Sequence, residues 1–246
     1  MGETREPILD VRGLEIRFGG VVAAEGFEVQ VFAHEIVGLI GPNGAGKTSI
    51  INGITGFYKA QSGEVRIAGQ NILGRRPHII SRLGVRRTFQ NLRLFGQLTV
   101  FDNIASGIRV EHHVAADELE TQIHDLCRLL EIPAVELNRA TQELPYGLQR
   151  RVELARALIA NPRIMLVDEP GAGLNSDEKR TVVQAMRRAV AEREMGAVLI
   201  EHDMGMITQA CDRVVVLDHG RLIAVGTAEE VRQNPDVIAA YIGTEE

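Results

Sequence analysis

Hydrophobic and polar residues alternate along the first third of the chain. From Ile8 to Phe18, and again over 27–31, apolar positions are separated by polar ones such as Glu28 and Gln30. A period of two puts apolar side chains on one face of a strand and polar side chains on the other. The pattern predicts half-exposed antiparallel strands at this end of the chain.

Short, fully apolar runs begin after Glu35. The run Ile36–Ile40 is followed by a glycine-rich turn and by a helical pattern from Lys47 to Gly56. Strands buried on both faces have this character, and the order strand, loop, helix is the unit of α/β folds. Further apolar runs at 164–167, 197–201 and 214–217 predict more strands of one doubly wound parallel sheet.

A stretch without strand signals lies between these runs. Residues 98–137 have helical periodicity, in segments 100–108 and 117–130. We interpret 98–147 as an inserted helical subdomain that ends in a functional loop. The remaining segments, 1–97 and 148–246, then form the α/β core with its N-terminal β-subdomain, and the whole chain is a single domain.

Helix-start signals support the rest of the core. Asn175 with Glu178 three residues later is a capping box, and it predicts a helix that runs to about Arg193. A second box begins at Thr227, and the pair Asn234-Pro235 opens another short helix.

The composition is that of an ordinary globular protein. The chain has 246 residues, of which 45% are hydrophobic, 24% charged and 4% aromatic. Its apolar runs are far shorter than the roughly 20 residues that cross a bilayer. The first ten residues contain acids and Pro7 where a signal peptide needs a basic start and an apolar run. These features predict a cytoplasmic location.

Charge and cysteine content exclude further classes. A formal net charge of -6 argues against nucleic acid as a partner, because phosphate backbones bind to net basic surfaces. The two cysteines, Cys127 and Cys211, have no partner at metal-binding or redox spacing. We expect both to be buried small apolar residues.

A phosphate-binding loop follows the first buried strand. The segment 41–48, Gly-Pro-Asn-Gly-Ala-Gly-Lys-Thr, matches G-x-x-x-x-G-K-[ST] in its required strand–helix context. Glycines let backbone amides turn inward around phosphate oxygens, and the helix N-terminus adds positive potential. Lys47 is predicted to reach the β and γ phosphates, and the Thr48 hydroxyl to ligate Mg²⁺. The alternative is a glycine-rich helix cap with an exposed lysine. The predicted nucleotide-binding residues here are Gly41, Asn43, Gly44, Ala45, Gly46, Lys47, Thr48 and Ser49.

Two acids end the apolar run at 164–167, where an open α/β sheet presents its ligand-binding edge. Asp168 is predicted to hold Mg²⁺, and Glu169 to polarise a water for in-line attack on the γ-phosphate. His202 follows another buried strand, so its neutral imidazole is predicted to hydrogen-bond the γ-phosphate or the water. A surface histidine at a strand end is the alternative for His202.

Together these residues resemble an ATP-binding cassette over essentially the whole chain. Phe18 resembles the aromatic residue that stacks on adenine, and Gln90 resembles the glutamine-loop residue. Segments 144–151, 171–175 and 201–203 occupy the signature, D-loop and histidine-switch positions in that order. The resemblance implies a P-loop NTPase fold that binds ATP and Mg²⁺, with Gln90 touching the metal or the water. The alternatives are a core position for Phe18 and a solvated amide for Gln90.

Within this family the chain resembles the ATPase subunits of branched-chain, or hydrophobic, amino acid importers. Segments 87–95, 168–175, 200–204 and 234–243 carry this likeness. It implies a second cassette ATPase, membrane permease subunits and, indirectly, an extracytoplasmic solute-binding protein. The helical subdomain, with Phe95 and the stretch 92–98 nearby, is predicted to receive the permease. An exporter ATPase and a soluble non-transport cassette ATPase are the alternatives.

The signature loop departs from the family pattern. Pro145 stands where the family prefers Ser, and it has neither a hydroxyl nor an N–H to offer a neighbouring γ-phosphate. Gly147, which we assign to ATP binding, and a helix expected over 148–160 retain backbone donors. The resembled importers commonly combine two different ATPase subunits, so the resemblance implies a heterodimer, which can tolerate one weakened site. With the departure at Pro145, we expect the ATP held by Lys47 of this chain to be hydrolysed better than the partner's.

Arginines and a polar cap accompany this loop. We expect Arg150, Arg151 and Arg156 to form a solvated or lobe-contacting face rather than a phosphate site. Asn175, in the D-loop segment, is interpreted as a helix cap that also offers a polar side chain.

Overall fold

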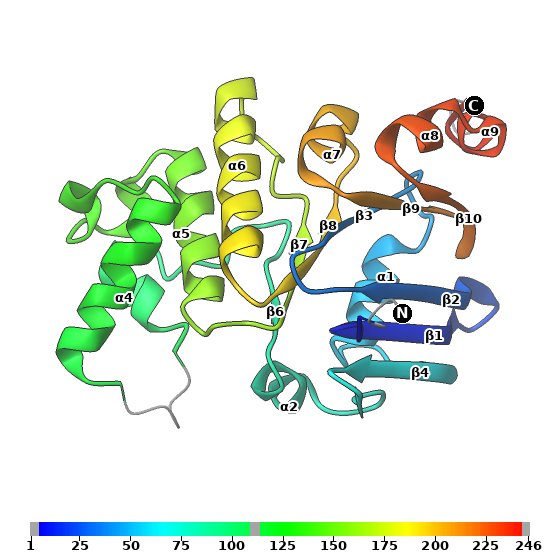
Figure 1. The fold of residues 1–246 in the computed structure, drawn as a ribbon, viewed down its shortest axis with the longest axis horizontal. Coiled ribbons are helices and arrows are strands. Elements are labelled where there is room, and N and C mark those ends of the chain that lie inside the picture. Colours follow the sequence, from blue (N-terminus) through cyan, green and yellow to red (C-terminus); the bar gives the residue numbers. More distant parts are fainter. Residues whose placement is uncertain (1–4, 109–113, 243–246) are drawn as a thin grey trace.

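The computed structural model describes residues 5–108 and 114–242. Two sheets and their helices make up the fold (Figure 1). The larger sheet has six strands in the order β10-β9-β3-β8-β7-β6. These strands are β3 (Ile36–Ile40), β6 (Val85–Arg87), β7 (Ile164–Asp168), β8 (Gly196–Ile200), β9 (Arg213–Asp218) and β10 (Arg221–Gly226). All neighbours pair in parallel except β10, which is antiparallel to β9. The predicted parallel sheet is confirmed, and residues 1–4 and 243–246 of the proposed domain lie outside the described residues.

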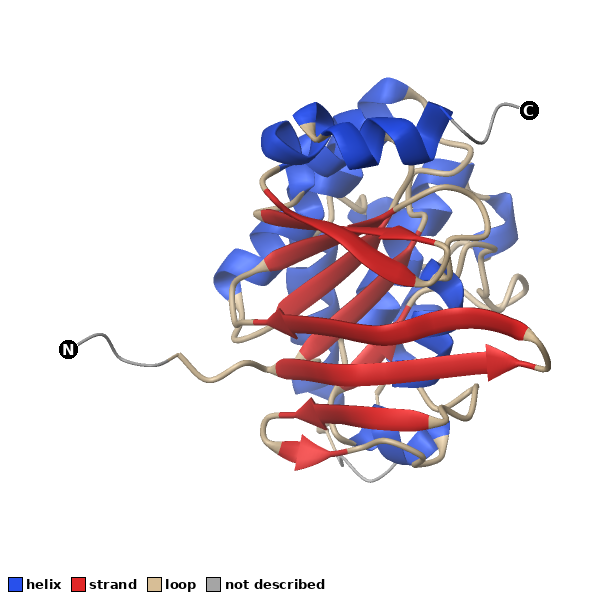
Figure 2. Cartoon of the chain, turned by 90° about the vertical axis from the view of Figure 1, so that its right-hand side faces the viewer, coloured by secondary structure: helices blue, strands red, loops and turns tan. Residues whose placement is uncertain are grey.

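A smaller antiparallel sheet has the strand order β2-β1-β4-β5 (Figure 2). Its strands are β1 (Leu9–Phe18), β2 (Val21–Val31), β4 (Ser62–Ile67) and β5 (Gln70–Asn71). The alternating pattern of the first two strands is therefore confirmed as antiparallel pairing. Neither β4 nor β5 is predicted from the sequence, because each is short and carries polar residues on its exposed positions.

Helices cover the parallel sheet. They are α1 (Lys47–Ile54), α2 (Pro77–Arg82), α3 (Val100–Ala105), α4 (Ala116–Leu129), α5 (Tyr146–Leu158), α6 (Ser176–Glu192), α7 (Met204–Ala210), α8 (Ala228–Gln233) and α9 (Pro235–Ile242). In Figure 1, α4 and α5 lie on one side of the molecule and the antiparallel sheet on the other. The start of α5 differs from the expected 148, because Pro145 is its N-cap residue and Tyr146 is already helical.

Each central strand is buried on both faces. On β3, Ile36 and Ile40 belong to the core that includes α5, α6 and α7, whereas Val37 and Leu39 belong to the core that includes α1 and the antiparallel sheet. Burial of one such side chain contributes about 1.5 to 3 kcal/mol to the stability of the fold. Because each central strand has buried side chains on both faces, a change of register would lose this contribution in both cores. The carboxyl ends of these strands are thereby fixed as a platform for the loops that follow.

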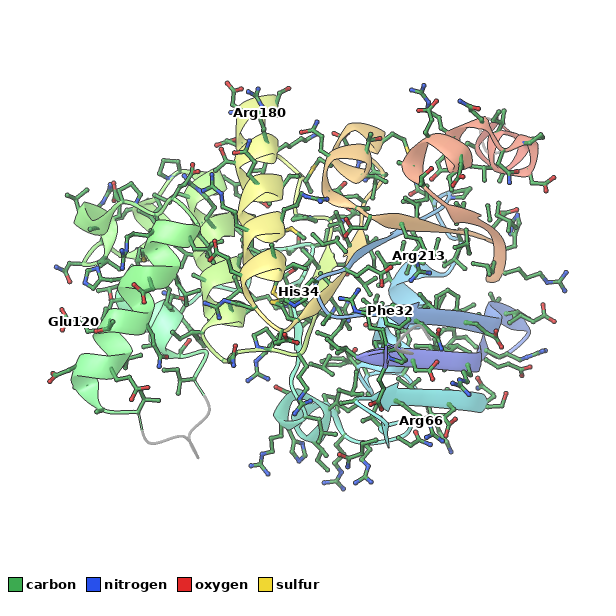
Figure 3. The ribbon with its side chains drawn as sticks, viewed as in Figure 1. Phe32, His34, Arg66, Glu120, Arg180 and Arg213 are labelled. Carbon is green, nitrogen blue, oxygen red and sulfur yellow. The ribbon has the colours of Figure 1, made fainter. Side chains whose placement is uncertain are left out.

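Arg213 ties the two sheets together. Its Nε donates to Glu35 Oε1 at 3.0 Å, and its Nη2 donates to the Gln30 carbonyl at 2.5 Å. Figure 3 shows Arg213 close to Phe32, where the end of β2 meets the parallel sheet. This junction holds the end of β2 beside the parallel sheet.

The cysteines differ from one another. Cys127 is buried, as predicted, but Cys211 is partly exposed, so the expectation of full burial is wrong for Cys211. Burial raises the pKa of Cys127 to about 11 and that of Cys211 to about 12. Both are therefore protonated and unreactive near neutral pH. Among the described residues, no helix combines the length and the apolar character that crossing a bilayer requires.

Candidate active site

The phosphate loop connects β3 to α1, and close backbone contacts fix its shape. A Cβ atom on Gly41 would lie 2.1 Å from the Leu217 carbonyl oxygen, and one on Gly46 would lie 2.0 Å from the Ala23 carbonyl oxygen. Gly46 is also the N-cap of α1, with φ of 101°. Gly44 has φ of 82° and faces open space. Two of the glycines are thus required by packing, as well as by access for a phosphate.

Lys47 lies folded over this loop. Its Nζ donates to the Gly41 carbonyl at 2.6 Å and to the Pro42 carbonyl at 2.9 Å. Burial lowers the pKa of Lys47, while the charges of Glu169 and Asp168 raise it in opposition. Lys47, Asp168 at the end of β7 and Glu169 directly after it therefore share one electrostatic environment, although more than a hundred residues separate the lysine from the two acids in the sequence.

Glu169 is held from two directions. Its Oε2 accepts a hydrogen bond of 2.8 Å from Gln90 Nε2, and its backbone N–H donates to the Ile200 carbonyl at 2.9 Å. Its φ is 45°, in the left-handed region, which costs a non-glycine residue roughly 1 to 2 kcal/mol. The surrounding bonds maintain this conformation and aim the carboxylate at the glutamine loop. Gln90 is exposed, as the solvated alternative expects, and its amide nevertheless makes this bond to Glu169.

Asp168 forms a buried ion pair that the sequence does not reveal. Its Oδ2 accepts from Arg87 Nη2 at 2.9 Å, and both side chains are 8% exposed. Arg87 also donates to Asn52 Oδ1 on α1. The guanidinium thus neutralises a carboxylate in the interior and joins β6, β7 and α1. Arg87 opens the sequence segment 87–95, but nothing in that segment indicates its partner.

Glu201 and His202 follow β8 and have opposite environments. Glu201 is 1% exposed, and its carboxylate accepts from the Gly171 N–H at 2.7 Å and the His202 N–H at 3.2 Å. The His202 side chain is 67% exposed. Within the described part of the chain, its ring makes no hydrogen bond to Glu169 or Gln90. The sequence predicted His202 but missed Glu201, the residue that fixes the turn after Glu169.

Phe18 is the last residue of β1. It is 45% exposed, so the alternative of a core position is wrong. Its ring meets that of Tyr58 edge-on, with centroids 4.9 Å apart and an interplanar angle of 80°. The two rings form an exposed aromatic surface, and Tyr58 is a member that the sequence analysis did not identify.

The signature loop leads directly into α5. Pro145 is its N-cap residue without a side-chain hydrogen bond, and its carbonyl accepts from the Leu148 and Gln149 amides at 3.0 Å. Gly147 therefore lies within the first turn, where a Cβ atom would be 2.4 Å from Glu178 Oε1. Leu148 is 6% exposed, which explains an apolar residue at this position. Asn175 caps α6 through the predicted capping box.

One arginine of α5 departs from the expectation of a solvated or lobe-contacting face. Arg150 has 0% exposure and donates to carbonyl oxygens of the glutamine loop. Arg151 fits the expectation better, because it donates to the Leu130 and Glu131 carbonyls that follow α4.

The oxygen donors present are suited to Mg²⁺. In residues 5–108 and 114–242, no group of three or more His, Cys, Asp or Glu side chains forms a metal cage. Magnesium in phosphate sites is held by one or two protein oxygens, together with phosphate and water. The exposed Thr48 hydroxyl at the start of α1 and the Asp168 carboxylate, whose Oδ1 lies outside the ion pair with Arg87, provide such oxygens.

A glycine-lined phosphate loop on this parallel sheet, with an antiparallel sheet on one side and helices on the other, is the architecture of an ATP-binding cassette, a class of P-loop ATPases. Residues 24–172 match the family model for ABC transporters. Residues 221–246 match that for branched-chain amino acid ATP-binding cassette transporters. The chain therefore belongs to the ABC transporter family, as one of its ATP-binding, ATP-hydrolysing proteins.

Known proteins are similar over nearly the full length. The high-affinity branched-chain amino acid transport ATP-binding protein BraF of Pseudomonas aeruginosa is 40% identical, covering 96% of this chain and 98% of the relative. The corresponding protein LivG of Escherichia coli strain K12 is 39% identical, covering 97% and 98%. The crystal structure of the ADP conformation of MJ1267, an ATP-binding cassette of an ABC transporter, superposes with a TM-score of 0.87 at 27% identity, covering 97% and 99%.

Proposed function

We propose that this chain is the ATPase subunit of an importer for branched-chain or other hydrophobic amino acids. The names of its relatives support the substrate class. The proposal of hydrolysis rests on the hydrogen bond between Gln90 and Glu169, which orients the Glu169 carboxylate at the edge of the sheet near Lys47.

The nucleotide is bound by residues from both sheets. Phe18, with Tyr58, offers an aromatic face to adenine, and such stacking contributes about 1 to 3 kcal/mol. The phosphates lie against the loop, where Lys47 exchanges its two carbonyl partners for phosphate oxygens. The residues assigned to the nucleotide are Phe18, Gly41, Asn43, Gly44, Ala45, Gly46, Lys47, Thr48, Ser49 and Asp168, with Gly147 contributed to the site on the neighbouring cassette.

Hydrolysis uses the residues at the carboxyl ends of β7 and β8. Glu169 orients and polarises the attacking water, and Gln90 fixes the direction of its carboxylate. Thr48, Asp168 and Gln90 would hold Mg²⁺, which would supply positive charge to the phosphate groups. The exposed ring of His202 lies free to contact the γ-phosphate or the water.

A permease is expected at a groove beside the glutamine loop. The groove has a volume of about 350 Å³. Its lining includes Arg86, Arg87, Arg93, Phe95, Glu153 and Arg156. Phe95 is 55% exposed and its ring lies 5.7 Å from the Arg156 guanidinium. An exposed aromatic residue in a cationic groove suits a partner segment with apolar and acidic side chains. We assign the inserted subdomain, 98–147, to the same coupling role.

The chain is proposed to pair head-to-tail with a second cassette ATPase, preferentially a different one, at the inner face of the membrane. An extracytoplasmic solute-binding protein delivers the amino acid to the permease. Because Pro145 offers no hydroxyl or N–H, the partner's ATP is hydrolysed more slowly than the ATP on Lys47 of this chain. No nucleic acid takes part.

Two experiments test this function. Co-purification of the tagged chain from native membranes should recover permease subunits and a second ATPase, and ATPase activity should rise when a branched-chain amino acid and its binding protein are added. Glu169→Gln should keep ATP binding and lower turnover by about 10² to 10⁴ fold, because an amide accepts the Gln90 bond but no proton. Unchanged turnover, or activation by unrelated solutes alone, would refute the assignment.

A further inference from the structure

A fully buried arginine connects the signature helix to the glutamine loop. Arg150, in the second turn of α5, is 0% exposed. Its Nη1 donates to the Phe89 carbonyl at 2.9 Å, and its Nη2 donates to the Gln90 carbonyl at 2.8 Å. The two nitrogen atoms of one planar group therefore bind two successive peptide units, 61 and 60 residues away in the sequence. Gln90 is held by its backbone here and by its side chain at Glu169.

A buried carboxylate completes this contact. Glu153, one turn after Arg150, is 3% exposed and accepts from Arg150 Nη1 at 2.7 Å. Burial raises the pKa of Glu153, while the charge and hydrogen bond of Arg150 and the Arg93 backbone amide lower it in opposition. Both members of the pair thus face the segment 89–93. Removing two charges from water is costly, so this pair requires the several partners that it has.

Arg150 also reaches the start of its own helix. Its Nη2 lies 3.3 Å from Tyr146 Oη, and its guanidinium carbon is 5.9 Å from the centroid of the Tyr146 ring. The same ring lies against the D-loop, where a Cβ atom on Gly173 would be 3.3 Å from it. One guanidinium therefore contacts the glutamine loop and the signature residue that packs on the D-loop.

We propose that Arg150 is a positioning residue that keeps the glutamine loop and the signature loop in fixed register. This inference rests on the proposed function, in which Gln90 contacts the ATP of this chain and the signature loop completes the neighbouring cassette's site. A displacement of Gln90 at the γ-phosphate is then passed through its carbonyl and Arg150 to Tyr146 and Gly147. Arg150 thereby makes each ATP site sensitive to the state of the other.

The chemistry of the contact requires arginine. A lysine ammonium is a single point with three donors, whereas the guanidinium fork matches two carbonyls and a carboxylate in one plane. Arg150→Lys should therefore retain the ion pair with Glu153 but only some of the hydrogen bonds to the Phe89 and Gln90 carbonyls. Arg150→Gln loses the charge and most of the donors.

The test is steady-state ATPase kinetics of the complex purified from membranes, with variants of this chain. Arg150→Gln should lower kcat about 10- to 100-fold while KM for ATP changes less than about 3-fold, because the phosphate loop is untouched. Arg150→Lys should recover part of the lost kcat. The matched control is Arg151→Gln on the same helix, whose partners are the Leu130 and Glu131 carbonyls and which should behave like the wild type.

A double variant tests the proposal if Arg150→Gln does not fold. In Arg150→Met with Glu153→Leu, apolar side chains replace the buried pair, a change that is often neutral or stabilising, but no donor is left for Phe89 and Gln90. It should fold and show the same fall in kcat. Wild-type kcat in this double variant, or equal losses for Arg150→Gln and Arg151→Gln, would overturn the inference. A wild-type complex without ATPase activity would refute the proposed function instead.

Discussion

The phosphate loop and the signature loop are both glycine-containing turns that open a helix, but they are stabilised differently. The phosphate loop is held by backbone atoms a few ångströms away, at Leu217 and Ala23. The signature loop begins at an N-cap residue without a side-chain bond, and a buried arginine one turn later secures it. The first loop is fixed in place by packing, whereas the second depends on a polar contact with the segment that contains Gln90.

We infer that the phosphate loop serves ATP binding, whereas the signature loop serves the coupling between the two ATP sites. A loop held by rigid packing keeps its shape whatever the partner does, which suits the retention of phosphate groups. A loop held through Arg150 can change when the glutamine loop changes. Substitutions in the first region should therefore abolish binding or folding, and substitutions in the second should change rates while binding persists.

The largest expected effect is that of Lys47→Ala. Its ammonium is placed to make two charge-assisted hydrogen bonds to phosphate, worth about 1.5 to 3 kcal/mol each, so ATP affinity should fall about 10² to 10⁴ fold. Equilibrium binding of a fluorescent ATP analogue to the full chain measures this change. Affinity near that of the wild type would show that the phosphate loop does not bind ATP through Lys47, and it would contradict the proposed difference between the two loops.

Packing within the phosphate loop predicts a clear difference between two glycines. Gly46→Ala should destabilise the fold by about 3 kcal/mol or more, because the new Cβ meets the Ala23 carbonyl and the backbone is left-handed. Gly44→Ala should cost only about 1 to 2 kcal/mol, since its surroundings are open. Calorimetric unfolding of both variants checks the ranking, and equal melting temperatures would contradict rigid packing at Gly46.

The signature loop offers a gain rather than a loss. Pro145→Ser restores a hydroxyl, and a hydrogen bond of about 1.5 to 3 kcal/mol to a charged group would raise hydrolysis at the neighbouring site about 10-fold or more. The activity is measured in the complex with Glu169→Gln in this chain, so that only the other site turns over. Pro145→Ala controls for removal of the ring. No rise with Ser, together with equal losses when the catalytic acid of either subunit is replaced, would show that the two sites are equivalent.

The smallest effect concerns pH. Burial raises the pKa of Glu153 above its ordinary value of 4.5, so the folded state binds this proton more tightly than the unfolded state does. Stability contributed by Glu153 is thus lost as the pH rises from about 4.5 through the raised pKa. Glu153→Gln should show a shallower decline of melting temperature over that window. Parallel curves for the two proteins would mean that Glu153 does not titrate differently on folding.

The sequence predicts what is encoded locally. The eight residues of the phosphate loop, the buried runs of the parallel sheet and the cap at Asn175 all lie within short windows, and each of these predictions is confirmed for the local structure. Roles toward ATP stay predictions. The helices α3 and α4 of the inserted segment are also found where the periodicity indicates them, although α3 ends earlier than expected. The next helix, α5, begins and ends earlier than the expected range 148–160.

Contacts between distant segments are what the sequence does not reveal. Arg150 and Arg151 together have the sequence pattern of a solvated helix face. Only the fold shows that the Phe89 and Gln90 carbonyls lie against Arg150. The same holds for the ion pair of Arg87 and Asp168, two residues that are 81 positions apart in the sequence. It holds also for Glu201, which is buried against the turn at Gly171. Each is a polar group whose role depends on its surroundings rather than on its neighbours in sequence.

Amide hydrogen exchange of the full chain, with and without Mg-ATP, tests most directly whether Arg150 links the two loops. In the wild type, ATP should slow exchange in segment 41–50 and also in segment 144–150. In Arg150→Gln, segment 41–50 should still be protected by ATP, whereas segment 144–150 should exchange at the same rate with and without nucleotide. Equal ATP-dependent protection of segment 144–150 in both proteins would contradict the account.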